Sequence, residues 1–122
     1  NVDSIVNCAL ECECSFKHLG VPYFELKWDD DPNQEIKSNI AAAAKFIYER
    51  HHEHGGKRVL VHCREGRSRS AALVIAYMMI YEKKSLQEAI TCLQKCRPIA
   101  QPNSGFLKQL QELEKEIAAV NL

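Results

Sequence analysis

The sequence predicts an α/β fold in which a central, mostly parallel sheet is flanked by helices. Short apolar runs of strand length alternate with longer segments whose apolar residues recur at helical spacing. In the stretch Val59–Ala72 (VLVHCREGRSRSAA), three apolar residues precede a loop rich in Gly, Ser and Arg, and a long apolar run follows. That order is typical of a buried strand, a loop of the size that holds a phosphate, and a buried helix.

Two strands and a helix are expected before this stretch. The strands lie near Ile5–Leu10 and Pro22–Lys27, and the second leads into the acidic turn Trp28–Pro32 (WDDDP). Over about Gln34–His54, isoleucines and alanines recur at helical spacing, and alanine favours helix. The pair Gly55–Gly56 is expected to end this helix.

Three helices are expected after the strand Val59–His62. The first covers about Ser70–Glu82 and is apolar almost all round, which indicates burial. The second begins at Ser85–Glu88 (SLQE), which has the spacing of a capping box, and ends near Cys96. The pair Asn103–Ser104 caps the last helix. A core-facing stripe on that helix is formed by Phe106, Leu107, Leu110, Leu113 and Ile117.

Composition excludes several classes of function. The 122 residues are enough for one domain with one core. The 16 basic and 16 acidic residues balance, so neither nucleic acid nor a membrane surface is an expected partner. The longest apolar stretch, Ala71–Tyr81, is too short to span a bilayer. The six cysteines are grouped rather than spread as a disulfide framework and fit zinc-ligand spacing poorly, so we expect a reducing compartment and no metal.

The loop after the central strand has the residues of an anion site. Backbone N–H groups that turn inward ahead of a helix N-terminus favour negative charge. Cys63 lies at the mouth of the loop, where this field lowers the pKa of a thiol. Arg69 offers a planar fork of donors, Ser70 places a hydroxyl near the sulfur, and Gly66 allows the tight reversal. A nucleophile, an oxyanion cradle and a cation at one site indicate covalent phosphoryl transfer.

The competing interpretation is a buried structural cysteine followed by a solvated basic loop. Of the six cysteines, only Cys63 has an arginine six positions later. A structural role leaves unexplained why His, Gly, Ser and Arg surround this thiol. The catalytic interpretation is therefore preferred.

The segment HCREGRSRS (His62–Ser70) resembles the signature of the cysteine-dependent phosphatases, His-Cys, five residues, then Arg-Ser, and is most similar to the dual-specificity protein phosphatases. AALVIAYMM after the loop and RPIAQPNSGFLKQL near the end resemble the same group. The resemblance implies one phosphatase catalytic domain over 1–122 that begins inside the family's usual N-terminal boundary. It also implies a phosphorylated protein as substrate, and no cofactor.

The resemblance assigns roles within the loop. Cys63 forms a phosphocysteine, Arg69 and the loop amides hold the phosphate oxygens, and Ser70 supports the sulfur as it leaves. His62 is expected to fix the loop from beneath. The implied substrate-binding residues are Arg64, Glu65, Gly66, Arg67, Ser68 and Arg69.

Such an enzyme also needs a carboxyl group that protonates the leaving oxygen and later deprotonates water. The clustered candidates are Asp29, Asp30 and Asp31. The alternative is a solvated turn closed by Pro32, which is how most acidic turns behave. The loop chemistry after Val59–His62 favours the catalytic interpretation.

Resemblance to the family helps to choose among these aspartates. Counting back from the pair Phe46–Ile47 points to Asp30, whereas counting back from Cys63 points to Asp31. The first count is preferred, because Gly55–Gly56 is where an inserted residue would be absorbed. Asp30 is therefore the predicted general acid and Asp31 the reserve.

Three functions stay open. The resemblance implies hydrolysis of phosphotyrosine and phosphoserine or phosphothreonine on proteins, in the cytoplasm or nucleus. Arg64 and Arg67 are similar in position to two lysines of phosphoinositide phosphatases, so a phosphoinositide or other polyanion is the alternative substrate, although Glu65 lies between them. The third is a catalytically weak module that binds phosphoproteins. The sequence defines neither the physiological substrate nor the oligomeric state.

Overall fold

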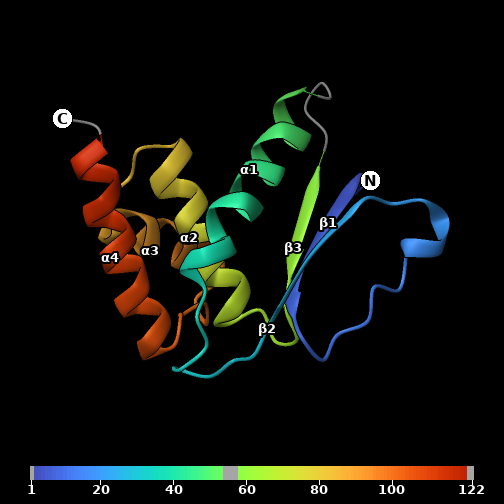
Figure 1. Cartoon of the computed structure of the whole chain (residues 1–122), viewed down its shortest axis with the longest axis horizontal. Coiled ribbons are helices and arrows are strands. Elements are labelled where there is room, and N and C mark those ends of the chain that lie inside the picture. Colours follow the sequence, from blue (N-terminus) through green and yellow to red (C-terminus); the bar gives the residue numbers. More distant parts are fainter. Residues whose placement is uncertain (1, 54–57, 121–122) are drawn as a thin grey trace.

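The computed structural model describes residues 2–53 and 58–120 (Figure 1). The elements in chain order are β1 (Ser4–Ala9), the short 3₁₀ helix η1 (Lys17–Leu19), β2 (Tyr23–Trp28), α1 (Lys37–Glu53), β3 (Val59–His62), α2 (Arg69–Tyr81), α3 (Leu86–Cys96) and α4 (Ser104–Val120). The predicted α/β fold class is confirmed. Within the described ranges, no helix is long and apolar enough to cross a membrane.

The three strands form a parallel sheet in the order β2-β1-β3. The register sets Ile5 of β1 between Tyr23 and Leu60. The four α-helices lie on one side of this sheet, and the segment that carries η1 extends from the other (Figure 1). Because parallel strands share one carboxyl edge, the segments after β1, β2 and β3 meet there.

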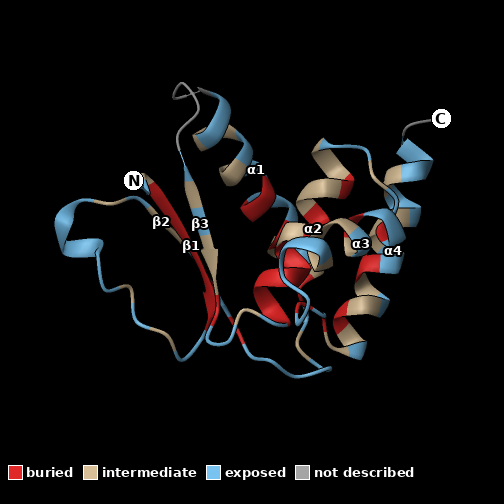
Figure 2. Ribbon diagram, turned by 180° about the vertical axis from the view of Figure 1, so that it is seen from behind, coloured by how far each residue is buried: buried red, intermediate tan, exposed pale blue. Residues whose placement is uncertain are grey.

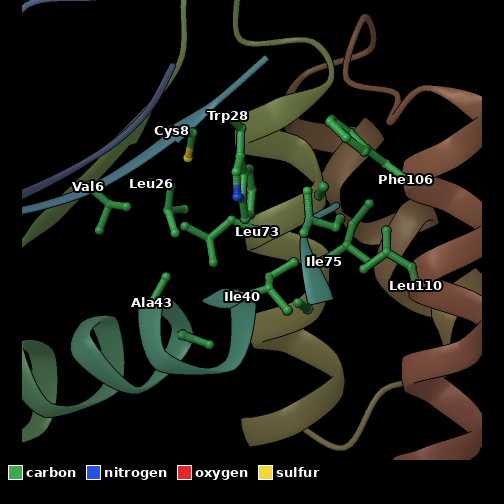
Figure 3. Packing of buried hydrophobic residues seen from close by; sticks show 14 of the residues in the cluster. Val6, Cys8, Leu26, Trp28, Ile40, Ala43, Leu73, Ile75, Phe106 and Leu110 are labelled. Carbon is green, nitrogen blue, oxygen red and sulfur yellow. The ribbon is translucent and has the colours of Figure 1, made fainter. Parts of the chain in front are cut away.

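The core lies between the sheet and the helices. Every residue of β1 is buried, as expected for the middle strand of a covered parallel sheet (Figure 2). Side chains of α1 and α2, among them Ala43 and Leu73, pack toward the sheet, and Leu110 of α4 extends the same buried cluster on the side away from the strands (Figure 3). This packing fixes the strand ends from which the site is built.

Trp28 anchors the end of β2. Its side chain is 1% exposed, and its ring lies 6.2 Å from that of Phe106 on α4. The indole N–H donates to Asn39 Oδ1 at 3.1 Å. Burial of one such aromatic side chain contributes roughly 1.5–3 kcal/mol to stability. The acidic turn therefore begins at a fixed point of the core.

Most predicted elements are present with shifted ends. The capping box of α3 is confirmed, since Ser85 Oγ accepts from the N–H of Glu88 and the Glu88 carboxylate accepts from that of Ser85. Helix α1 begins at Lys37 rather than Gln34, because the segment before it is bonded to α4 instead of to its own turn. The predicted end at Gly55–Gly56 lies outside the described residues, and η1 was not predicted.

Candidate active site

Cys63 follows β3 directly and lies at the floor of the loop that leads into α2. Its Sγ is 3.2 Å from Ser70 Oγ. Burial raises the pKa of this thiol, but hydrogen bonds from the Ser70 hydroxyl and from the N–H groups of Ser70 and Gly66, with the charge of Arg69, outweigh it. The net pKa of Cys63 is lowered, so the sulfur is prepared to act as a thiolate.

Replacing Ser70 by alanine is expected to raise the pKa of Cys63, because the thiolate loses its side-chain donor. The rate of alkylation by iodoacetate, measured against pH, reports this pKa directly. The alkylation curve of Ser70→Ala should move to higher pH than that of the wild type. An unshifted curve would show that the backbone donors and Arg69 suffice to hold the thiolate.

Arg69 is the cation of the site and is only 5% exposed. Its Nη1 and Nη2 donate to the two carboxylate oxygens of Glu11 at 2.6 and 2.7 Å, and Nη1 also donates to the Trp28 carbonyl at 3.1 Å. Among the residues that the structure describes, Nε of Arg69 is the one buried side-chain nitrogen or oxygen without a hydrogen-bond partner. That N–H has no acceptor among the described residues.

Glu11 lies in the turn after β1 and was missed in the sequence. Asn7 holds this turn, since its side chain accepts from the N–H of Ala9 at 3.0 Å and donates to the carbonyl of Cys12 at 2.9 Å. The bond to Arg69 lowers the pKa of Glu11 to about 2. A buried arginine needs a charged partner. Glu11 comes directly after β1, as the acidic turn comes after β2, and this position could have identified it as the partner.

These groups line a cavity of about 250 Å³ at the carboxyl edge of the sheet. Its lining comprises Glu11, Asp30, Cys63, Arg64, Glu65, Arg67, Ser68 and Arg69. The volume is sufficient for a phosphate group. A second cavity of about 290 Å³ shares Cys63 and is also lined by His62. The role of His62 in fixing the loop stays a prediction.

Of the three clustered aspartates, Asp30 lines the first cavity together with Cys63 and Arg69. Its Oδ1 accepts a hydrogen bond from Asn103 Nδ2 at 3.0 Å. Asp31 Oδ1 accepts from the N–H of Asn33 at 2.7 Å, within its own turn. Asp30 therefore lines the same cavity as the thiol, whereas the Asp31 carboxylate is hydrogen-bonded within its own turn.

The segment after α3 holds the loop from outside, and this too was missed in the sequence. Arg97 donates to the carbonyls of Glu65 at 2.9 Å and Gly66 at 3.0 Å. The N–H of Gln101 donates to the Arg67 carbonyl at 2.6 Å. Because these carbonyls face outward, the loop N–H groups are left for the inner side, as the bond from Gly66 to the Cys63 sulfur shows.

Gly66 fits this arrangement for two reasons. Its φ is +68°, in the left-handed region that favours glycine. A Cβ at this position would lie 2.9 Å from Nε of Arg97. The guanidinium therefore packs directly on the loop backbone.

Comparison with known proteins gives consistent matches. A family model described as dual specificity phosphatase, catalytic domain, matches residues 1–116. Bovine dual specificity protein phosphatase 26 is 41% identical over 103 residues, which cover 84% of this chain and 48% of that protein. The chain thus spans about half the length of this relative.

Two solved human structures are similar along nearly the whole chain. Human DUSP28 has a TM-score of 0.88 and 30% identity, covering 97% of this chain and 80% of that one. A human tyrosine phosphatase-like serine/threonine/tyrosine-interacting protein has a TM-score of 0.80 and 33% identity, and the match covers 92% of this chain and 76% of that one.

Proposed function

This chain belongs to the family of dual specificity phosphatase catalytic domains, and on that premise we propose that it hydrolyses phosphotyrosine and phosphoserine or phosphothreonine on proteins through a phosphocysteine intermediate. One observation carries the proposal. The segments after all three strands deliver a thiol, a guanidinium held by Glu11, and a carboxyl group to one cavity of phosphate size.

In the first step, the Cys63 thiolate attacks phosphorus and a P–S bond forms as the bond to the leaving oxygen breaks. Asp30 gives its proton to that oxygen. Arg69 Nε and the loop N–H groups bind the equatorial oxygens, whose negative charge they stabilise. The dephosphorylated hydroxyl product then departs.

In the second step, water attacks the phosphocysteine. The Asp30 carboxylate takes the proton of the water, and the P–S bond breaks to release inorganic phosphate. The Ser70 hydroxyl, 3.2 Å from the sulfur, stabilises the thiolate as it leaves. Cys63 is thereby restored as a thiolate, and Asp30 carries a proton again.

A polyanionic substrate such as a phosphoinositide is the second candidate. It is favoured by Arg64 and Arg67, which are exposed and line the cavity beside the loop. Two exposed cations would bind further phosphate groups. Glu65 lines the same cavity and opposes them, so protein substrates rank first.

The deciding experiment measures phosphate release from a phosphotyrosine peptide, a phosphothreonine peptide and a soluble phosphoinositide, each beside Cys63→Ser. Hydrolysis of both peptides, abolished by the substitution, supports the proposal. A preference for the phosphoinositide favours the second candidate. Binding of a peptide without release of phosphate would favour a phosphoprotein-binding module.

We also propose that the protein acts in a reducing compartment, the cytoplasm or the nucleus. All six cysteines are free thiols, including the buried Cys8. Cys63 acts only while it is reduced, and reducing compartments preserve such a thiolate. Fractionation of cells that express the full-length protein would test the location.

A further inference from the structure

Asn103 lies directly before α4 and connects three parts of the site. Its backbone N–H donates to Ser68 Oγ in the loop at 2.9 Å. Its side-chain Nδ2 donates to Asp30 Oδ1 at 3.0 Å. Its Oδ1 accepts from the N–H of Phe106 in the first turn of α4 at 2.9 Å. One residue thus bonds the anion loop, the acidic turn and a helix.

The helix fixes which way the Asn103 amide faces. An oxygen at the N-cap accepts from the third helical N–H, which here belongs to Phe106. Turning the amide by 180° would place its NH₂ group against that N–H, and the cap would be lost. The amide nitrogen therefore faces Asp30, whose Oδ1 serves as an acceptor.

The acidic turn is supported by the same end of α4. A Cβ on Gly105 would lie 1.8 Å from the carbonyl oxygen of Pro32, so the two backbones are in direct contact. Gln109 Oε1 accepts from the N–H of Ile36 at 2.7 Å, and Gln109 Nε2 donates to the Gln34 carbonyl at 2.8 Å. The position of the turn is therefore set by α4.

We infer that Asn103 is a positioning residue for proton transfer by Asp30, an inference that rests on the proposed function. Because the amide donates to Oδ1, the transferable proton resides on Oδ2. Oδ1 can accept from the amide in both the protonated and the ionised carboxyl group, although the bond to the ionised form is the stronger, so Asp30 keeps one orientation through both steps. Asn103 itself touches neither the phosphate nor the leaving group.

Asn103→Ser separates positioning from helix capping. Serine is a favourable N-cap and the backbone N–H to Ser68 is retained, whereas the amide donor to Asp30 is lost. Ser85→Ala is the matched control, because it removes the cap of α3, which bonds Glu88 and not the acidic turn. Melting temperatures of both variants report the structural cost.

The readout is kcat/KM for phenyl phosphate and for p-nitrophenyl phosphate, because kcat/KM reports the first step, in which the leaving group departs. Phenolate is the poorer leaving group and needs the proton more. For Asn103→Ser, we expect kcat/KM to fall by about 10-fold with phenyl phosphate and by about 3-fold or less with p-nitrophenyl phosphate. Ser85→Ala should leave the ratio of the two unchanged.

The same substitution in an Asp30→Asn background completes the test. If Asn103 acts through Asp30, Asn103→Ser should then change kcat/KM by no more than about 2-fold. An equal loss on both substrates, or a loss that persists in this background, would overturn the inference and assign the effect to Ser68 and the loop. Failure of the wild type to hydrolyse either substrate would instead refute the proposed function.

Discussion

Cys63→Ser is expected to lower the hydrolysis of p-nitrophenyl phosphate by about 10⁴-fold or more, because no other thiol lines the cavity that holds Arg69 and Asp30. A serine hydroxyl stays protonated in the field that stabilises a thiolate. Steady-state release of p-nitrophenol measures the effect. A phosphoenzyme trapped by rapid acid quench should form with the wild type and not with the variant.

Cys92→Ser is the matched control, since it removes a half-buried thiol on α3 that lines neither cavity. Its kcat should equal that of the wild type. Near-normal hydrolysis by Cys63→Ser would refute the phosphocysteine mechanism altogether.

Asp30→Asn should lower kcat/KM for phenyl phosphate by about 10²-fold, with a smaller loss for p-nitrophenyl phosphate. Asparagine preserves the size of the side chain but carries no transferable proton. Phosphate release from both substrates measures the two losses.

Asp31→Asn is the comparison variant, because the Asp31 carboxylate bonds Asn33 in its own turn and does not line the cavity. We expect it to keep most of the activity on both substrates. If Asp31→Asn cut this activity and Asp30→Asn left it unchanged, the acid would have been assigned to the wrong residue.

The parts of the site that the sequence predicted are encoded locally. Cys63, Arg69 and Ser70 lie within eight consecutive residues, which run from the end of a predicted strand into the first turn of a predicted helix. The order of strands and helices followed from the same patterns. Both the fold class and the anion loop could therefore be predicted from the short-range spacing of residues.

The residues that the sequence did not reveal act across long separations. Glu11 bonds Arg69 over 58 positions, and Asn103 bonds Asp30 over 73. Such pairs depend on strand register and helix docking, which no local pattern specifies. Counting along the chain left Asp30 and Asp31 open for the same reason, because spacing in sequence does not say which carboxylate its own turn occupies.

Helix α4 closes the core through Phe106 and Leu110 and supports the acidic turn through its first two turns. During synthesis it leaves the ribosome after every other element of the fold. By then the strands, the anion loop and Cys63 have been synthesised, but the acidic turn still lacks its contacts with Asn103, Gly105 and Gln109. We therefore expect that a nascent chain that stops before α4 carries the Cys63 thiol but lacks the helix that fixes the position of Asp30.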